Sequence, residues 1–129
     1  MKPDISTSAD IRNLIDTFYT KVQADETIGF IFNEIAQVDW SQHLPVMYSF
    51  WEFMLLGMQD TYRGNPIQKH LDLHKKIPLK IEYFDRWLSL FQATVDELFE
   101  GPTAESAKFR AYSIAEVWKP KFDGPFAVK

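Results

Sequence analysis

Residues 81–98 read IEYFDRWLSLFQATVDEL and carry a strong hydrophobic pattern. Their large apolar side chains recur every three or four residues, which is the repeat of one face of an α-helix. These side chains are Ile81, Phe84, Trp87, Leu88, Phe91, Val95 and Leu98. The pattern predicts a long amphipathic helix whose apolar face is turned toward a core.

The N-terminal part of the chain shows the same repeat. Apolar residues of a first predicted helix are Ile11, Leu14, Ile15, Phe18 and Val22. Ser6, Thr7 and Ser8 precede them as candidate N-cap residues, since their side-chain oxygens can accept hydrogen bonds from the first turn. An apolar turn is predicted over residues 28–32, and Asn33 and Glu34 are expected to open a loop.

Two further helices are predicted in the middle of the chain. One begins at Asp39, where Gln42 three residues on resembles a capping box, and is expected to end at Gly57. Its face carries Trp40, His43, Leu44, Met47, Trp51, Met54 and Leu55. A shorter helix is predicted between Pro66 and Pro78, with Ile67, His70, Leu71 and His74 on one face.

A last helix is predicted from about Ala104 to Trp118. Gly101-Pro102 breaks the preceding helix, Thr103 offers an N-cap, and Pro120 is expected to end regular structure. No stretch reads convincingly as a strand. The sequence therefore predicts an all-α fold, which could be a plain bundle or a globin-like packing.

The composition is that of a soluble globular protein, with 46% hydrophobic and 25% charged residues in a chain of 129. That length suits one domain over 1–129, with a core over about 8–119 and a loose tail over 120–129. No apolar run could span a membrane, no signal peptide is recognisable, and cysteine is absent, so we expect a cytoplasmic protein. The net charge of −4, without a Lys/Arg run, argues against nucleic acid as a partner.

Aromatic residues and histidines raise the question of a bound group. Aromatic residues form 16% of the chain, which fits a core around a large planar ligand and equally fits a ligand-free aromatic core. All three histidines, His43, His70 and His74, lie on apolar helix faces. A buried imidazole stays neutral or finds a partner, and a metal ion is one such partner.

Two kinds of metal site are open to these histidines. Zinc or non-haem iron would need inward carboxylates, and the Glu-x-x-His pattern of metal-binding bundles is absent. Haem needs one axial imidazole, an apolar slot and a polar group opposite, so it is modestly favoured. Tyr19 and Trp87 lie on or beside predicted buried faces. Each fits either a core-boundary residue or a hydrogen-bond donor directed into a ligand pocket.

A series of short motifs spans the chain from about Ile11 to Trp118. They are FY (18–19), GFIFN (29–33), WSQH (40–43), FWEFMLLG (50–57), YRGNP (62–66), KHLDL (69–73) and YFDRWLSLF (83–91). In this order and spacing they resemble the truncated haemoglobins, or two-over-two globins. The absence of a Gly-Gly pair resembles the third group of that family.

The resemblance implies a shortened two-over-two helical sandwich around haem b, with the iron held by one proximal histidine. The YRGNP and KHLDL motifs favour His70, whereas the usual spacing back from Phe84 and Trp87 gives His74. On the opposite face the resemblance implies Tyr19, His43 and Trp87 as hydrogen-bond donors, with His43 alternatively a gate or an iron ligand. The implied pocket walls are Phe18, Phe32, Met47, Phe50, Trp51, Phe84, Leu88, Phe91 and Ile114, and the candidate propionate partners are Arg63, Lys69 and Arg86.

The implied partners are dioxygen and other small diatomic ligands. Several donors in a dry pocket would slow oxygen release, which suits sensing or oxygen, nitric oxide or peroxide chemistry better than bulk transport. Turnover of nitric oxide or peroxide would need an external reductase. The alternative is a non-haem helical module that binds a metal or another protein.

Overall fold

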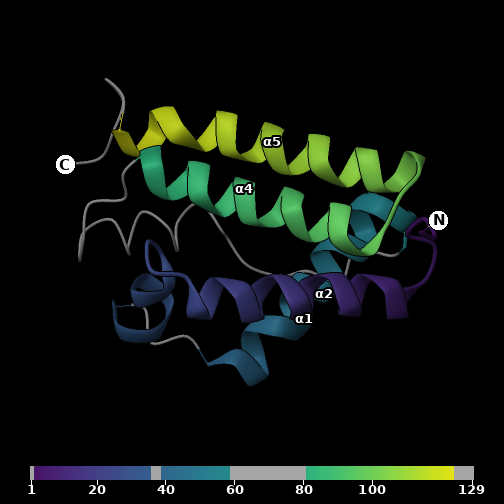
Figure 1. The fold of residues 1–129 in the computed structure, drawn as a ribbon, viewed down its shortest axis with the longest axis horizontal. Coiled ribbons are helices and arrows are strands. Elements are labelled where there is room, and N and C mark those ends of the chain that lie inside the picture. The colour runs from purple at the N-terminus through teal and green to yellow at the C-terminus, as the bar shows by residue number, and fades with distance from the viewer. Residues whose placement is uncertain (1, 36–38, 59–80, 124–129) are drawn as a thin grey trace.

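The structure, a computed structural model, describes residues 2–35, 39–58 and 81–123 (Figure 1). Every regular element in these ranges is helical, which confirms the predicted all-α class. The elements are α1 (Ser8–Ala24), the π-helix η1 (Ile31–Ile35), α2 (Trp40–Leu56), α4 (Ile81–Leu98) and α5 (Pro102–Asp123). The helix predicted between Pro66 and Pro78 lies outside the described residues, and so do His70 and His74.

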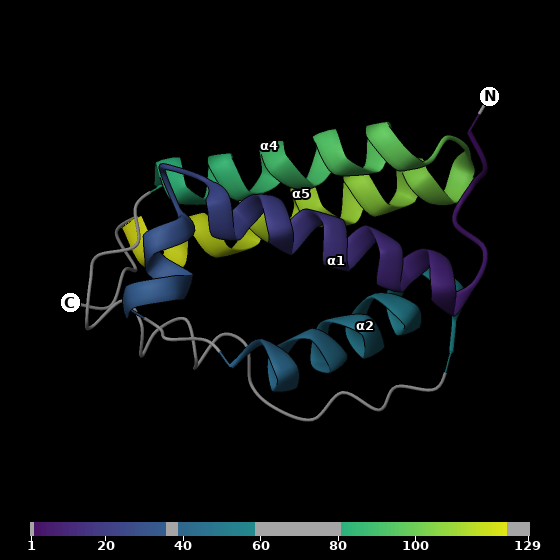
Figure 2. The same ribbon diagram turned by 60° about the horizontal axis from the view of Figure 1, so that its bottom comes forward.

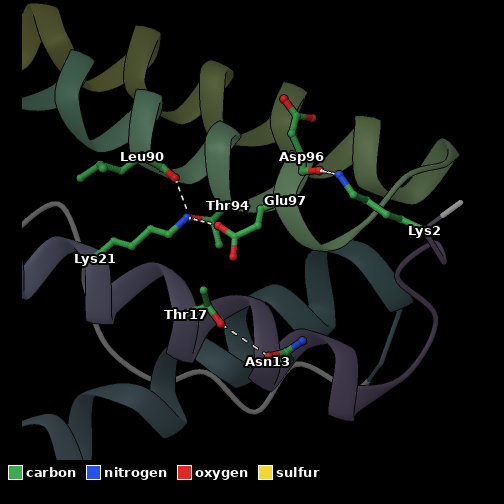
Figure 3. A network of polar contacts seen from close by, with 8 residues as sticks. All are labelled: Lys2, Asn13, Thr17, Lys21, Leu90, Thr94, Asp96 and Glu97. Atoms are coloured by element: carbon green, nitrogen blue, oxygen red, sulfur yellow. Dashed lines mark hydrogen bonds and ion pairs between the residues drawn. The ribbon is translucent and has the colours of Figure 1, made fainter.

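The helices form two pairs that meet through α1 and α4. α4 and α5 lie side by side, joined by a short connection, and α1 lies between α4 and α2 in the view of Figure 2. Lys21 of α1 forms an ion pair with Glu97 of α4 at 2.5 Å on the surface of this contact (Figure 3). The arrangement agrees with the expected two-over-two packing. None of the described helices combines the length and apolarity that crossing a bilayer requires.

α1 contributes six buried side chains to the core. Its buried residues are Ile11, Leu14, Ile15, Phe18, Tyr19 and Val22, as the predicted stripe requires. Thr7 is the N-cap: its hydroxyl accepts from the Asp10 N–H at 3.2 Å, while the Asp10 carboxylate accepts from the Thr7 N–H at 3.1 Å. This reciprocal capping box satisfies two N–H groups that the first turn leaves without a helical partner.

The loop predicted at Asn33 and Glu34 is wrong. The chain continues as η1 through both residues to Ile35. The side-chain amide of Asn33 donates to the Gln23 carbonyl oxygen at 3.0 Å, and Ile28 and Ile31 are buried. The hydrogen bond of Asn33 to α1 and the burial of Ile28 and Ile31 hold this segment in place. It therefore stays helical although Asn33 and Glu34 are polar.

The caps of α2 lie at the predicted residues, Asp39 and Gly57, but the N-terminal cap uses a different partner. The Asp39 carboxylate caps the helix by accepting from the Ser41 N–H at 3.1 Å and the Ser41 hydroxyl at 2.6 Å, so Ser41 takes the place expected of Gln42. Gly57 ends the helix in the left-handed conformation with φ of 67°, which costs glycine little because it has no Cβ.

The two ends of α5 correct the sequence-based expectation. Thr103 does not cap the helix; the Asp4 carboxylate does, accepting from the N–H groups of Thr103 at 3.0 Å and Ala104 at 2.8 Å. Pro120 does not end the helix, which runs to Asp123. A proline removes one intrahelical hydrogen bond and crowds the carbonyl four residues earlier, yet α5 continues past Pro120 as α2 does past Pro45.

Candidate functional site

Tyr19 is the polar centre of an aromatic cluster between α1 and α2. Its side chain is 6% exposed, and its ring centroid lies 5.3 Å from that of Trp40 and 5.4 Å from that of His43. Phe32 of η1 lies 6.1 Å away and stacks on Trp40. The π-helix thus brings an aromatic ring from the end of the α1 segment onto the first turn of α2. A hydroxyl group in such surroundings is largely shielded from water.

The Tyr19 hydroxyl has a polar neighbour on α4. Burial raises the pKa of Tyr19 to about 12, while a hydrogen bond from the Trp87 side chain acts in the opposite direction. The indole N–H can only donate, so the tyrosine oxygen is its acceptor. A phenol with this pKa stays protonated at neutral pH, so its own hydrogen is available to a further acceptor. Tyr19 and Trp87 therefore place one O–H donor and one N–H donor beside each other.

His43 approaches the same tyrosine from α2. Its ring lies edge-on to Tyr19 at 82° and edge-on to Trp40 at 79°, and its Nε2 atom is buried. The structure therefore brings together Tyr19, His43 and Trp87, three residues that come from three different helices. Each carries a polar hydrogen or can carry one, and none is a carboxylic acid.

The predicted wall residues fall into two groups. Phe18, Trp51 and Phe91 are buried and pack on one another, with ring centroids 5.1 Å apart for Phe18 and Phe91 and 4.8 Å apart for Trp51 and Phe91. The second group consists of large apolar side chains that pack on this core and stay partly exposed: Phe32, Met47, Phe50, Phe84, Leu88 and Ile114. Most of the predicted wall is therefore not closed by its neighbours.

These residues fit a large, flat, apolar group that carries a polar ligand on the side facing Tyr19. α1 buries six residues, whereas α2 buries only Trp51 although its stripe holds many large apolar side chains. The partly exposed apolar side chains of α2 and α4 are available to pack against a bound group. Across residues 2–35, 39–58 and 81–123, His, Cys, Asp and Glu side chains do not gather in groups of three that could hold a metal ion directly.

The candidate propionate partners receive no support from the described residues. The guanidinium of Arg86 pairs with the Asp25 carboxylate at 2.6 Å, and Arg63 and Lys69 lie outside the described ranges. An open surface hollow on α4 and α5 is lined by residues that include Lys108 and Phe109, and it contains none of the predicted site residues.

Sequence reasoning missed two residues that shape the site. Trp40 was assigned only to a helix face, yet it contacts Tyr19, His43 and Phe32. Its place at the start of the WSQH motif was the available signal. Asp25 was not singled out, because a single aspartate after a helix gives no periodic signal and its partner Arg86 is 61 residues away.

Comparisons with known proteins agree with the fold and the motif order. A sequence model of the Bacterial-like globin family matches residues 4–117. The chain is 35% identical over 118 residues to the Group 3 truncated hemoglobin ctb of Campylobacter jejuni subsp. jejuni serotype O:2, covering 89% of this chain and 90% of that protein. The crystal structure of the group III truncated hemoglobin from Campylobacter jejuni superposes with a TM-score of 0.82 at 31% identity, covering 100% of both chains. The chain therefore belongs to the Bacterial-like globin family, as a haem-binding truncated haemoglobin of the third group.

Proposed function

We propose that the chain binds haem b against the partly buried apolar faces of α2 and α4 and holds a diatomic ligand, dioxygen above all, beside Tyr19. The observation that carries this proposal is the buried Tyr19 hydroxyl, with Trp87 as its hydrogen-bond partner and His43 against its ring. When bound, haem supplies a ferrous iron to which dioxygen, nitric oxide or carbon monoxide attaches. The protein supplies the position and the hydrogen bonds.

Tyr19 would act as the main donor. Its raised pKa, about 12, keeps the hydroxyl protonated over the whole physiological range, so the donor persists at any pH the cell reaches. Trp87 orients that hydroxyl by donating to its oxygen, and the surrounding rings exclude water. A hydrogen bond to a charged acceptor is worth about 1.5–3 kcal/mol, or roughly ten- to a hundredfold in affinity. Such a site favours retention of the ligand, which suits sensing or ligand chemistry better than transport.

His43 would be a second donor or a gate. Its ring packs edge-on against Tyr19 and Trp40, so rotation of the imidazole would open or close the approach to the tyrosine hydroxyl. Ligation of iron by His43 when no ligand is present remains a prediction from the family resemblance. The external reductase also remains a prediction, and so do the cytoplasmic location and the single domain over 1–129, which rest on composition and length.

The axial ligand in this proposal is His70, with His74 as the alternative. Both lie outside the described residues, so the assignment rests on the YRGNP and KHLDL motifs. His70→Ala is expected to abolish stable haem binding, seen as loss of the Soret absorption after gel filtration, while His74→Ala keeps it. The opposite pattern would transfer the axial role to His74.

Two measurements test the proposal as a whole. Protein expressed with haem available should show a Soret band, and ferrous protein should release dioxygen at least about tenfold faster in Tyr19→Phe than in the parent chain. Tyr112→Phe is the matched control, because Tyr112 is 45% exposed on α5 and should leave release unchanged. Colourless protein that takes up no added hemin would contradict haem binding. Unchanged release in Tyr19→Phe would remove Tyr19 from the donor role.

A further inference from the structure

Asp25 holds the end of α1 with an unusually well-satisfied carboxylate. Its side chain is only 4% exposed. One oxygen accepts from the backbone N–H groups of Thr27 and Ile28, each at 3.0 Å. The other accepts a hydrogen bond from Arg86 Nε at 2.8 Å and forms an ion pair with Arg86 Nη2 at 2.6 Å. Burial alone would raise the pKa of Asp25, but the bonds from Arg86, Ile28 and Thr27 outweigh it and hold that pKa below its ordinary value.

This contact links the two helices that carry Tyr19 and Trp87. Arg86 directly precedes Trp87 on α4, and Asp25 follows α1 six residues after Tyr19, which corresponds to about 9 Å along a helix axis. Asp25 and Arg86 therefore fix one point of the α1–α4 contact, and the Tyr19–Trp87 pair forms the next point along it. Successive side chains on a helix differ by about 100° in direction. A small rotation of α4 would thus carry the Trp87 indole away from the Tyr19 hydroxyl.

The same aspartate also shapes the approach to η1. Its backbone carbonyl accepts from the Gly29 N–H at 3.0 Å, so the turn over residues 25–29 is held by both side chain and backbone. A Cβ on Gly29 would lie 2.8 Å from the Gln23 carbonyl oxygen, so this turn packs closely against the end of α1. The segment beyond it delivers Phe32 to the ring of Tyr19.

We propose that Asp25 and Arg86 are positioning residues for the donor pair, and that their two-nitrogen contact holds the Trp87 N–H on the Tyr19 hydroxyl. A planar guanidinium that reaches a buried carboxylate through two nitrogens fixes orientation as well as distance. Lys21 and Glu97 join the same two helices through a single contact in which neither side chain is buried, with 32% and 54% exposed, and such pairs contribute little. They therefore provide a matched control for an ion pair that does not set orientation.

The first experiment follows the Trp87 indole N–H by proton–nitrogen NMR in the full chain, with and without added haem (as the ferrous carbon monoxide form). The signal is assigned by its loss in Trp87→Phe. We expect Asp25→Asn and Arg86→Lys to move this signal and to speed its exchange with water about tenfold, while Lys21→Gln changes neither. An unmoved Trp87 signal in both variants would overturn the proposal.

The second experiment asks whether the effect passes through Trp87, and it rests on the proposed function. Dioxygen release is measured in Asp25→Asn, in Trp87→Phe and in the double variant. If Asp25 acts by placing Trp87, Asp25→Asn speeds release in the parent chain by about tenfold and has no further effect once Trp87 is replaced. Equal effects in both backgrounds would show that Asp25 acts by another route and would overturn the positioning role.

The two experiments keep the failures of the two proposals apart. If no haem binds, the release measurement has no signal, but the NMR measurement on the full chain still decides the positioning role. Arg86→Gln serves if Asp25→Asn fails to fold, because the Arg86 side chain is 44% exposed and its loss leaves no cavity in the core. Far-ultraviolet circular dichroism of each variant verifies that the helices remain.

Discussion

The hydroxyl of Tyr48 on α2 donates a hydrogen bond to the carboxylate of Asp16 on α1. The guanidinium carbon of Arg12, one turn earlier on α1, lies 5.2 Å from the centre of the Tyr48 ring. This tyrosine therefore joins α2 to α1 on the outer side of their contact, while His43 and Tyr19 meet on the inner side. Burial and the neighbouring Asp16 raise the pKa of Tyr48 to about 12, so its proton stays on the oxygen at neutral pH.

Replacing this tyrosine tests the polar link between the two helices. Tyr48→Phe removes the hydrogen bond and keeps the ring, so the free energy of unfolding should fall by about 1 kcal/mol. Urea denaturation of the parent and the variant measures it. Tyr112→Phe, which removes an exposed hydroxyl on α5, should change the value by less than about 0.5 kcal/mol. An equal loss in both variants would count against the link.

The cap of α5 by Asp4 predicts a sensitive N-terminal segment. Asp4→Ala leaves the N–H groups of Thr103 and Ala104 without their acceptor, so the free energy of unfolding should fall by about 1–2 kcal/mol. Thermal unfolding followed by circular dichroism measures the loss. Asp96→Ala is the control, because the Asp96 side chain pairs with Lys108 at the surface and its removal should cost little.

Gly101 should tolerate a side chain less well than Gly57. Both have positive φ, 143° and 67°, and a left-handed conformation costs other residues roughly 1–2 kcal/mol. A Cβ on Gly57 meets nothing within 4 Å, whereas one on Gly101 would lie 2.5 Å from the Asp4 Cγ. Gly101→Ala should therefore lower the midpoint of urea unfolding more than Gly57→Ala does. The reverse order would mean that the Asp4 side chain moves away from the added methyl group without lowering the stability.

Acid should weaken the fold through three aspartates. Burial alone would raise the pKa values of Asp4 and Asp25, but the hydrogen bonds to their carboxylates outweigh it. The pKa of Asp10 is lowered first of all by the hydrogen bond from the Ser6 N–H. All three pKa values therefore lie below the ordinary 3.8. Because the folded chain binds these protons less readily than the unfolded chain, the stabilisation is complete well above 3.8 and is lost as the pH falls through the lower folded values.

Urea unfolding between pH 7 and pH 2.5 measures this dependence. In Asp25→Asn the decline on acidification should be shallower than in the parent chain, since one titrating group is gone. A decline that begins near neutral pH would point to other groups, and an identical slope in the variant would exclude Asp25 as a contributor.

Local repeats made the helices predictable, and contacts distant in sequence did not. The stripe from Ile11 to Val22 predicts the buried face of α1, because apolar residues three or four apart lie on one side of a helix. The stripe on α4 is only partly correct, since Phe91 and Val95 are buried but Ile81 is 41% exposed. The cap that Asp4 gives to Thr103 joins residues 99 positions apart. No local sequence pattern indicates such a distant partner. The sequence therefore predicted Thr103, which is next to the helix start, as the N-cap of α5.

The candidate site divides in the same way. The burial of Tyr19 follows from its position next to Phe18 on the inner side of α1, and the helix pattern could foresee it. The grouping of Tyr19, His43 and Trp87 required the order of motifs along the whole chain, since each residue comes from a different helix. The support that Asp25 and Arg86 give to this group depends on how α1 and α4 meet, which neither periodicity nor motif order encodes.

The Asp4 cap also bears on how the chain matures. During synthesis Asp4 is made before Thr103 and Ala104. Its carboxylate therefore has no partner in α5 until about a hundred further residues have been added. The first turn of α5 gains this acceptor only when Asp4 comes back to it. The cap therefore closes a loop of about a hundred residues, and the entropy of that closure is set against the hydrogen bonds it gains.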